Sequence, residues 1–441
     1  MISNVSSLVT DLAARAAKGR PVTIGVVGAG QMGTDLIVQL ALMPGIRLGA
    51  IAVRNVGNAI EVAVQNGHRR ENVIEAKTSA TMDAAIEKGL LPITGDIATL
   101  AACGHIEVLI DATGNPNTGT QIALEAIRNG KHIVMMNVEA DITIGRYLHA
   151  EARSAGVVYT GAAGDEPAAA IELISFAQSL GLGVVCAGKG KNNPLKFDAV
   201  PADYDVEARE RNMNPRMLVE FIDGSKTMVE MVAIANATGL VPDQPGMHGP
   251  SAPREDLSEI LIPKKDGGVL GGKGRVDYST GKGVAPGVFC VVESDHPRVI
   301  ERMADLKVGK GPYFTLFRPY HLTSLEAPLS AARAVLYGTA DMVPLQRPVA
   351  EAVAVAKRDL RVGEILGKIG EAEYRAWAMT YPAAQAEQAI PVGLAEGARI
   401  TKSVKAGDYL NATNCVADGS MLVTQIRHRL DQMDAQAMAA E

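Results

Sequence analysis

The stretch VTIGVVGAGQMGTDL, residues 23–37, constrains the fold more than any other part of the chain. It joins a run of small and β-branched apolar residues to a helical pattern through three glycines in a GxGxxG arrangement. In this arrangement the first glycine permits a tight turn, the second lets a pyrophosphate approach the backbone, and the third lets the helix pack closely on the strand. Because it follows a predicted strand and opens a predicted helix, the motif predicts a dinucleotide site, with a merely glycine-rich turn as the alternative. The expected contacts are Gly28, Gly30, Gln31, Met32 and Gly33.

Residues 23–160 continue as an alternation of short apolar runs and amphipathic helical patterns. Near-continuous apolar strands separated by such helices are typical of a parallel sheet that is covered on both faces. The sequence therefore predicts an α/β fold in which residues 1–160 form a Rossmann-type, doubly wound, NAD(P)-binding domain. Residues 1–20 contain Asp11 within a mildly apolar stretch and predict an amphipathic helix rather than a secretory signal.

The next stretch, residues 161–345, is predicted to form a mixed α/β domain for substrate binding, catalysis and dimerisation. Its segment 321–340 is expected to pack back on the first domain. The glycine-rich segment 268–294 has strand-like ends and predicts a long loop or a hairpin. Helical patterns cover residues 161–182, 213–238 and 321–336.

Residues 346–441 are predicted to form a small β-rich domain that ends in a helix near 419–436. Within this domain, AKRDLRVGEIL at 356–366 and ITKSVKAGDYL at 400–410 echo each other. In both segments a glycine followed by an acidic residue comes after basic residues, which suits a tight turn with a positive φ.

The composition excludes several classes of function. With 441 residues and 47% hydrophobic side chains, the chain has room for two or three cores. The formal net charge of −6 provides no field to attract nucleic acid or an anionic membrane surface, and no apolar run is long enough to span a bilayer. The four cysteines lack the spacing of a zinc site or a disulfide framework, so we expect a cytoplasmic protein.

Arg54 and Asn55 follow the second predicted strand, where an NAD site usually offers a carboxylate to the ribose 2′-hydroxyl. An arginine at this position can instead pair with a 2′-phosphate, so the sequence predicts NADPH as the coenzyme. The alternative is a solvated loop charge.

Polar residues also follow later strands of this domain. The segment DATGNPN, residues 111–117, places Thr113 and Gly114 where a nicotinamide ribose would lie, and Asn137 occupies a similar strand end. We expect these three residues to contact the coenzyme, although both strand ends are equally consistent with ordinary helix caps.

Asp165 and Glu166 stand on a turn before an apolar helical pattern. Two adjacent carboxylates can hold a divalent cation such as Mg²⁺ or Mn²⁺, which would clamp the carbonyl and hydroxyl of a substrate. An aspartate at this position is equally suited to capping the helix.

Lys189, Lys191 and Asn192 follow an apolar strand in the segment KGKNNP, residues 189–194. Two lysines around a glycine, next to amides, make a compact anion site, and a lysine here can donate a proton to a developing alkoxide. An exposed loop would have the same composition.

The segment DGSKTMVEMVAIANATG, residues 223–239, places Lys226 and Glu230 on one face of a predicted helix just after Asp223. A surface ion pair is the simpler interpretation. However, nearly all flanking residues are apolar, so we expect Glu230 to be buried with a partner, as carboxylates in clefts often are.

The glycine-rich segment 264–283 carries five lysines or arginines and is predicted to be a lid that closes over a phosphate or carboxylate, with a solvated hairpin as the alternative. Arg318 and His321 add a further cationic point that would bind substrate, although a lone histidine is more often structural.

Together, GVVGAGQMG, IDATGNP, GDEPAAA, DGSKTMVEMVAIANATG and AKRDLRVGE resemble the homoserine-dehydrogenase-like oxidoreductases that carry a C-terminal SAF domain. Among these the chain is most similar to the 1-deoxy-D-xylulose 5-phosphate reductoisomerase-like enzymes, which make 2-C-methyl-D-erythritol 4-phosphate for isoprenoid biosynthesis. The resemblance implies an SAF-like domain at residues 346–441, an NADPH-dependent reductoisomerase activity, and a homo-oligomer, either a dimer or a tetramer.

The same resemblance implies a mechanism. The phosphate of a ketose would be held by Lys189, Lys191 or the basic segment, and its hydroxy-ketone by Asp165 and Glu166 through a divalent cation. NADPH would then reduce the rearranged aldehyde while Lys226 or a water supplies the proton. Asp223, Lys226 and Glu230 lie on the stretch comparable to the helix that supports hydride transfer in homoserine dehydrogenases.

Two other functions stay open at this point. One is an NADP-dependent dehydrogenase of another small hydroxy acid, semialdehyde or sugar derivative, which needs the same coenzyme but no metal. The other is a dinucleotide-sensing regulator without catalysis, for which the sequence shows no basic recognition helix.

Overall fold

The computed structural model describes residues 7–192, 195–211 and 213–440, with side chains described through residue 436. The chain divides into two compact units, and each unit is formed by two separate stretches of sequence. The first unit comprises Met1–Asp165 and Leu322–Val343, and the second comprises Glu166–His321 and Pro344–Glu441.

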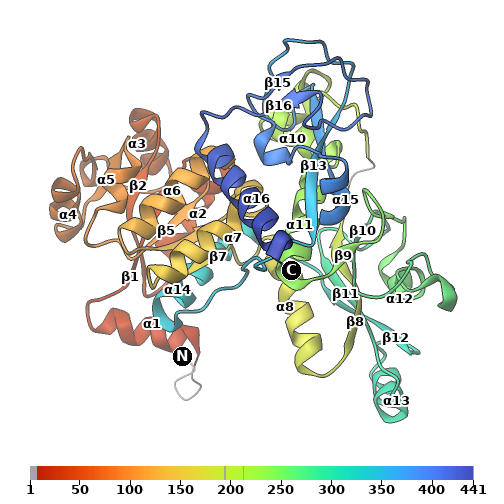
Figure 1. Cartoon of the computed structure of the whole chain (residues 1–441). Coiled ribbons are helices and arrows are strands. Elements are labelled where there is room, and N and C mark those ends of the chain that lie inside the picture. The colour runs from red at the N-terminus through yellow and green to blue at the C-terminus, as the bar shows by residue number, and fades with distance from the viewer. Residues whose placement is uncertain (1–6, 193–194, 212, 441) are drawn as a thin grey trace. The chain divides into compact units, whose positions relative to one another are not determined.

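The first unit is built on a seven-stranded sheet in which all pairings are parallel (Figure 1). The strand order β3-β4-β2-β1-β5-β6-β7 places β1 and β5 where the winding of the sheet reverses. This order confirms the predicted Rossmann-type sheet. The strands are β1 (Val22–Val27), β2 (Ile46–Ala52), β3 (Val73–Glu75), β4 (Leu91–Thr94), β5 (Val108–Asp111), β6 (His132–Met135) and β7 (Tyr159–Gly161).

Alternate residues of a strand face opposite sides of the sheet, so the apolar strands give it apolar side chains on both faces. Helices bury these side chains. Val22, Ile24 and Val26 of β1 are fully buried in a cluster with residues of α1, α2 and α14. A second buried cluster joins β2, β3 and β4 to α2 and α3. The helices are α1 (Leu8–Ala17), α2 (Gln31–Leu42), α3 (Val56–Gln65), α4 (Ser79–Glu87), α5 (Ile97–Ala101), α6 (Pro116–Arg128), α7 (Val138–Ser154) and α14 (Ala327–Tyr337).

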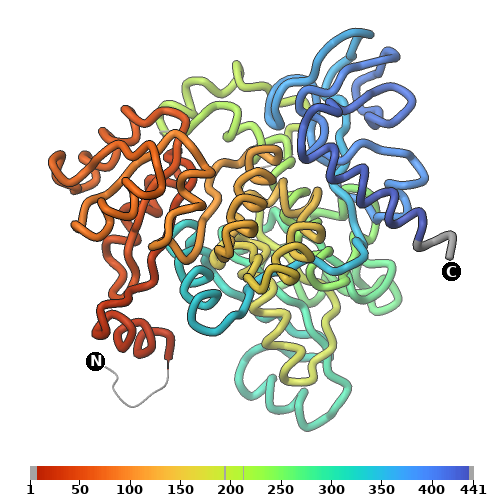
Figure 2. The backbone as a smooth tube through the Cα atoms, turned by 60° about the vertical axis from the view of Figure 1, so that its left-hand side comes forward, coloured from red at the N-terminus to blue at the C-terminus, as the bar shows by residue number. Residues whose placement is uncertain are grey.

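The segment Leu322–Val343 returns to the first unit late in the sequence (Figure 2). Its helix α14 packs against β1, β5 and β6, and the end of the segment lies beside the edge strand β7. There the backbone N–H of Gly161 donates to the carbonyl of Met342 at 2.9 Å, and the N–H of Asp341 donates to Thr160 Oγ1 at 2.9 Å.

The second unit contains a five-stranded mixed sheet of order β12-β11-β8-β10-β9. The strand-like ends predicted for residues 268–294 are present as β10 and β11. Of the two predicted alternatives, a long loop or a hairpin, the structure has the loop, because β8 lies between β10 and β11. Strand β10 approaches β8 closely at Gly188, where an added Cβ would lie 1.6 Å from the carbonyl oxygen of Asp277. The strands are β8 (Gly183–Gly190), β9 (Val241–Pro242), β10 (Arg275–Ser279), β11 (Val288–Glu293) and β12 (Tyr313–Arg318).

The helical pattern predicted for residues 213–238 forms two helices rather than one. Helix α10 ends at Ile222, and Gly224, with a φ of 87°, separates it from α11. A left-handed residue stops an α-helix, and glycine adopts that conformation without steric cost. The helices of this unit are α8 (Glu166–Ser179), α9 (Asp205–Glu210), α10 (Pro215–Ile222), α11 (Ser225–Thr238), α12 (Leu257–Ile260), α13 (Pro297–Asp305), α15 (Tyr381–Ala386) and α16 (Leu422–Ala440).

The C-terminal residues Pro344–Glu441 belong to the second unit, together with Glu166–His321. The physical reason is a set of buried hydrogen bonds to α11. The side chain of Asn236 accepts from the N–H groups of Val349 and Ala350, and Ser225 Oγ accepts from the N–H of Ala376. The strands here are β13 (Ala350–Ala356), β14 (Tyr374–Thr380), β15 (Arg399–Ile400) and β16 (Cys415–Val416).

The two echoing segments of this C-terminal region pair with each other. The backbones of Leu360 and Val404 exchange two hydrogen bonds, of 2.9 and 3.1 Å. Gly363 and Gly407 have φ values of 90° and 91°, which confirms the predicted positive-φ turns.

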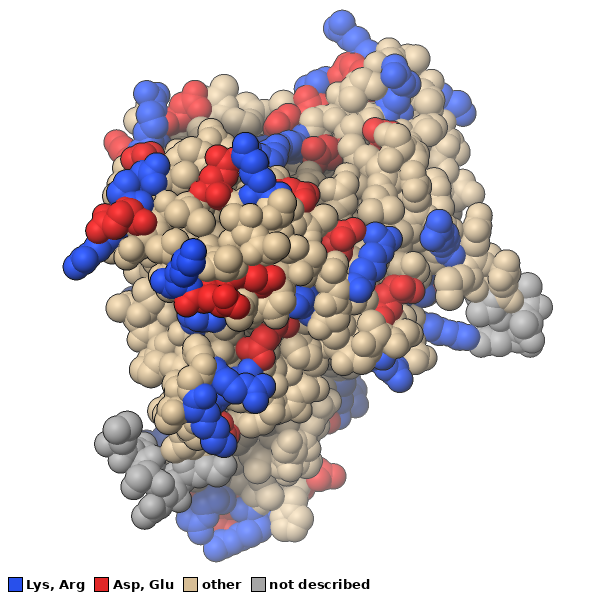
Figure 3. Space-filling view, turned by 90° about the vertical axis from the view of Figure 1, so that its left-hand side faces the viewer, with Lys and Arg blue, Asp and Glu red and all other residues tan. Residues whose placement is uncertain are grey.

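None of the helices in the described part of the chain is both long and apolar enough to cross a membrane. On the face shown in Figure 3, basic and acidic side chains are interspersed, in agreement with the small net charge of −6.

Candidate active site

Each of the three motif glycines in the first unit meets a different steric requirement. Gly28 has a φ of 106°, and a Cβ added there would lie 2.9 Å from the carbonyl oxygen of Ala112. A Cβ added at Gly33 would lie 2.2 Å from the carbonyl oxygen of Gly28, so α2 can pack this closely only with glycine. A Cβ added at Gly30 would meet nothing within 4 Å. The backbone at Gly30 therefore faces open space, as the approach of a pyrophosphate requires. We call residues 28–33 the glycine corner.

The N-terminus of α2 differs from those of the helices that follow it. Gly30 caps α2 without a side-chain hydrogen bond, whereas each helix from α3 to α7 has a side chain that accepts a hydrogen bond from its first turn. The N–H groups of Gln31, Met32 and Gly33 in the first turn of α2 consequently have no capping side chain. Such N–H groups and the helix dipole attract negative charge.

The loop after β5 is held by a buried carboxylate. Asp111 accepts hydrogen bonds from Thr113 N at 2.9 Å, Thr113 Oγ1 at 2.6 Å and Asn137 Nδ2 at 3.2 Å. Burial raises the pKa of Asp111 to about 6, although these hydrogen bonds oppose the rise. Asn137 also caps α7 by accepting from Ala140 N at 3.1 Å, and Asn115 caps α6. The helix caps considered from the sequence are therefore present, while Asp111 holds Thr113 beside the strand end.

Arg54 and Asn55 lie immediately after β2, and both are exposed. Asn55 caps α3 by accepting from Asn58 N at 3.1 Å, so its side chain has a structural role. The guanidinium of Arg54 is at the surface beside the carboxyl end of β2, the position from which the second ribose of a dinucleotide is usually recognised.

In the second unit, Lys189, Glu166 and Glu230 form a buried group that we call the lysine–glutamate cluster. Lys189 Nζ donates to Glu166 Oε1 at 2.7 Å and also to Glu230 Oε2. Lys189 is 5% exposed and Glu230 is 1% exposed. The three residues come from β8, from the first turn of α8 and from α11. Burying a lysine and two glutamates costs free energy, because all three groups lose hydration. Such a cluster therefore points to a function for its charges.

The charges of this cluster shift the pKa values of the two glutamates in opposite directions. Burial opposes ionisation of Glu166, but the charges of Lys189 and His321 outweigh it and lower the pKa of Glu166 to about 2. Burial and the charge of Glu166 raise the pKa of Glu230 to about 7, against Lys189 and Lys226. Burial alone would lower the pKa of Lys189, but the two carboxylates raise it to about 12. The two carboxyl groups therefore share their titration: the pKa of Glu166 is lowered and that of Glu230 is raised, so the pair keeps one negative charge and exchanges a second proton near neutral pH.

His321 lies beside the cluster, with Nε2 3.4 Å from Glu166 Oε1. Asp165, the last residue of the first unit before α8, is half-buried. The predicted metal pair of Asp165 and Glu166 does not fit a divalent cation here, because Glu166 already binds the ammonium group of Lys189. Among the described residues no group of three or more His, Cys, Asp and Glu side chains could hold a metal ion.

Lys191 follows β8 and is 6% exposed. Its Nζ donates to the carbonyl oxygen of Phe221 at 2.5 Å, and burial together with the charge of Lys189 lowers its pKa to about 8. Asn192 is exposed next to it. The remainder of the predicted anion site, Asn193 and Pro194, lies outside the described residues.

The prediction that Glu230 is buried with a partner is confirmed, and that partner is Lys189. Lys226 and Glu230 are four apart on α11, but Lys226 is only half-buried, and its charge acts on Glu230 by lowering its pKa. Asp223 is buried and binds Lys357, whose Nζ lies 3.0 Å from Asp223 Oδ2. Sequence reasoning missed Lys357 because it is 134 residues from Asp223. The basic start of the echoing segment 356–366 was the available signal.

Cationic side chains of two further predicted substrate-binding segments form ion pairs with acidic residues of the protein. Arg318 forms an ion pair with Glu172 at 2.6 Å. In the predicted lid 264–283, Lys273 binds Glu293, and Arg275 belongs to β10, where its Nε lies 2.8 Å from Asp243 Oδ1. The lid prediction is therefore wrong for the part of the segment that forms a paired strand.

Two parts of the chain match known protein families. Residues 28–160 match the family model described as the NAD binding domain of homoserine dehydrogenase, and residues 164–327 match the model described as the catalytic domain of oxidoreductase DRL. Residues 28–160 are thus similar to an NAD-binding domain of the homoserine dehydrogenase type, and residues 164–327 are similar to an oxidoreductase catalytic domain. Neither match extends into residues 346–441 or supports the SAF-like domain predicted there.

The homoserine dehydrogenase of Pseudomonas aeruginosa is 31% identical over 139 residues. The aligned region is 32% of this chain and 28% of that enzyme, so it spans little more than a quarter of the relative's length.

Among solved structures, a probable dehydrogenase from Thermotoga maritima is similar over 72% of this chain and 90% of its own, with 15% identity and a TM-score of 0.41. GenD2 from gentamicin A biosynthesis, in complex with NAD, is similar over 79% of this chain and 92% of its own, with 15% identity and a TM-score of 0.38. Similarities of this size carry no functional conclusion.

Proposed function

We propose that the protein is an NADP-dependent dehydrogenase that interconverts a hydroxyl and a carbonyl group on a small hydroxy acid, semialdehyde or sugar derivative. The observation that carries this proposal is the buried Lys189 between Glu166 and Glu230. A dehydrogenase of this kind needs a proton donor at the carbonyl oxygen in a site that excludes water. The family models support the oxidoreductase class.

Lys189 is the residue that we assign to the substrate oxygen. Its ammonium group has three N–H bonds, of which two are donated to the glutamates. In the described part of the chain it has no third partner, which leaves one N–H for a carbonyl oxygen. Bound coenzyme supplies the hydride. Lys189 polarises the carbonyl and protonates the resulting alkoxide, and neutral Glu230 returns a proton to Lys189.

Glu166 has a different task in this scheme. Because its pKa is lowered to about 2, it stays ionised and keeps Lys189 charged and oriented throughout the reaction. Glu230, whose pKa is raised to about 7, is the group that can gain or lose a proton at neutral pH. In the oxidation direction the same groups work in reverse.

For the coenzyme we assign the pyrophosphate to Gly28, Gly30 and the first turn of α2. The open space at Gly30 and the uncapped N–H groups of Gln31 and Met32 support this assignment. The exposed Arg54 supports NADPH over NADH.

A second candidate is the reductoisomerase that converts 1-deoxy-D-xylulose 5-phosphate to 2-C-methyl-D-erythritol 4-phosphate. It needs the same coenzyme, and the buried Lys191 favours a phosphorylated substrate. We place it second because the cation-binding role that it requires of Asp165 and Glu166 conflicts with the ion pair between Glu166 and Lys189.

The test follows the oxidation of NADPH and of NADH by the full chain with aspartate semialdehyde, small keto acids, keto sugars and 1-deoxy-D-xylulose 5-phosphate. We expect turnover with a semialdehyde, keto acid or keto sugar, unchanged by a chelator. Turnover with deoxyxylulose phosphate that is lost on chelation would favour the second candidate. Coenzyme binding without turnover on any substrate would contradict both.

A further inference from the structure

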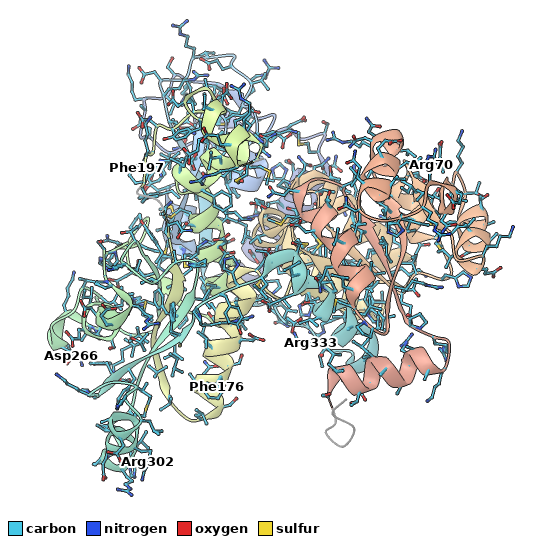
Figure 4. The ribbon with its side chains drawn as sticks, turned by 180° about the vertical axis from the view of Figure 1, so that it is seen from behind. Arg70, Phe176, Phe197, Asp266, Arg302 and Arg333 are labelled. Atoms are coloured by element: carbon cyan, nitrogen blue, oxygen red, sulfur yellow. The ribbon has the colours of Figure 1, made fainter. Side chains whose placement is uncertain are left out.

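The second unit contains a buried arginine that the reaction proposed above does not use. Arg375 lies on β14 and is 9% exposed. Its guanidinium carbon is 4.2 Å from the ring centre of Phe197 and 4.3 Å from that of Trp377. The two rings meet edge to face with their centres 5.4 Å apart; Figure 4 labels Phe197. The rings therefore fix the guanidinium in a corner.

This guanidinium lacks hydrogen-bond partners. Its Nη1 is buried without one, and in the part of the chain that the structure describes no side chain or carbonyl accepts a hydrogen bond from Arg375. A guanidinium carries five N–H donors in a planar fork, and leaving a buried charged donor unsatisfied is costly. Burial lowers the pKa of Arg375, which expresses the same cost.

The charges around Arg375 do not balance. Lys191, Lys357 and Arg375 all feel the negative charge of Asp223, which already binds Lys357 through Oδ2 and the N–H of Ser225 through Oδ1. Lys191 has one recorded acceptor, a backbone carbonyl. The lysine–glutamate cluster carries at most one net negative charge, so positive charge remains in excess in this buried region.

We propose that Arg375 and Lys191 bind an anionic phosphate or carboxylate group of the substrate. This inference rests on the proposed function, because it assigns the substrate class of the same site. Lys191 lies two residues from Lys189, and alternate residues of an extended chain lie roughly 6–7 Å apart on one side. The anionic group is therefore a few bonds from the reacting carbon. The substrate is then a small anionic hydroxy or keto compound, and neutral sugars are excluded.

Trp377 provides a local signal for the test, because it is the single tryptophan of the chain and contacts Arg375. The full chain is titrated with inorganic phosphate and, separately, with acetate, at constant ionic strength and without coenzyme. We expect a saturable change in tryptophan fluorescence with at least one anion, matched by heat in calorimetry. Arg375→Gln and Lys191→Gln should each weaken binding about 10- to 100-fold, as loss of a charge-assisted hydrogen bond implies. Arg375→Lys should weaken it less.

The matched control is Lys265→Gln, which removes one positive charge from an exposed position of the same unit and should change nothing. Saturation by phosphate alone assigns a phosphorylated substrate, and saturation by acetate alone assigns a carboxylic acid. The proposal is overturned if neither anion binds the wild-type chain, or if binding is equal in Arg375→Gln, Lys191→Gln and the control. NADPH binding to the same samples, followed separately, tests the proposed function itself, so the two failures are distinguishable.

Discussion

The glycine corner and the lysine–glutamate cluster can both stabilise a charged group, but they use different parts of the chain to do so. The glycine corner uses backbone N–H groups from one stretch of six residues, 28–33, and carries no side-chain charge. The lysine–glutamate cluster uses three charged side chains that are up to 64 positions apart, from Glu166 to Glu230. The glycine corner is formed by neighbouring residues and depends on open space beside the backbone. The lysine–glutamate cluster is formed by residues far apart in the sequence, and its opposite charges must neutralise one another because they are buried.

Removing the cation from the cluster should have the largest effect on the molecule. In a Lys189→Met variant, Glu166 and Glu230 are buried without their common partner, and the carbonyl oxygen loses its proton donor. We expect turnover to fall by about 10³-fold or more, with a loss of roughly 3–5 kcal/mol in the free energy of unfolding. Steady-state kinetics and urea unfolding measure the two effects.

The affinity for NADPH should remain within about twofold in this variant, because the glycine corner is in the other unit. Lys189→Arg keeps the charge and should recover most of the stability but little of the turnover. Lys265→Met removes an exposed lysine and serves as the control. Wild-type turnover in Lys189→Met would remove Lys189 from the chemistry.

Substitutions at two glycines of the glycine corner should distinguish the contribution of this segment to coenzyme binding from its contribution to stability. In Gly33→Ala the new Cβ would lie 2.2 Å from a backbone oxygen, so we expect a loss of about 1–3 kcal/mol in stability together with weaker coenzyme binding. In Gly30→Ala the new Cβ meets nothing within 4 Å, so stability should be unchanged while the Kd for NADPH rises about tenfold or more.

Thermal unfolding and coenzyme titration of both variants distinguish the two roles. If Gly30→Ala bound NADPH as tightly as the wild type, the pyrophosphate would not approach the backbone at this position.

This contrast explains how much the sequence could predict. The Rossmann sheet and the glycine corner follow from neighbouring residues, because strand, turn and helix obey local rules. The positive φ of Gly363 and Gly407 was predictable for the same reason. The pairing of Leu360 with Val404 was not, since a shared turn pattern does not say which segments meet.

The cluster was predicted in its parts but not in its pairing. The apolar surroundings of Glu230 predicted a buried carboxylate with a partner, but they could not identify that partner as Lys189. The position of Lys189 depends on the order of the strands in the sheet, because β8, which carries Lys189 between two glycines, lies between β10 and β11. Neither that order nor the contact of Lys357 with Asp223 can be read from local spacing.

The pH dependence of stability tests the charge state of the cluster. The pKa of Glu230 is raised from 4.5 to about 7, so between these pH values the folded chain holds a proton that the unfolded chain has lost. Stability contributed by this group therefore falls as the pH rises through that range, by at most about 1.4 kcal/mol per pH unit. Glu230→Gln cannot ionise, and its stability should fall less steeply with pH.

Urea unfolding at several pH values between 5 and 7.5 measures both slopes. Other buried carboxyl groups with raised pKa values, such as Asp111 and Asp277, contribute equally in the two proteins, so the difference isolates Glu230. Glu61→Gln, at an exposed glutamate, should keep the wild-type slope. Equal slopes for Glu230→Gln and the wild type would mean that Glu230 is ionised throughout.

The smallest expected effect concerns the edge of the coenzyme site, where a side chain rather than the backbone makes the choice. Arg54 is exposed, so Arg54→Gln should leave folding and the binding of NADH unchanged. If the guanidinium pairs with the 2′-phosphate, the Kd for NADPH should rise about tenfold, since a charge-assisted hydrogen bond at a surface is worth about 1.5 kcal/mol. Parallel titrations with both coenzymes measure this ratio. An equal loss for NADH and NADPH would show that Arg54 supports the loop after β2 rather than selecting the coenzyme, and specificity would then have to come from the backbone of that loop.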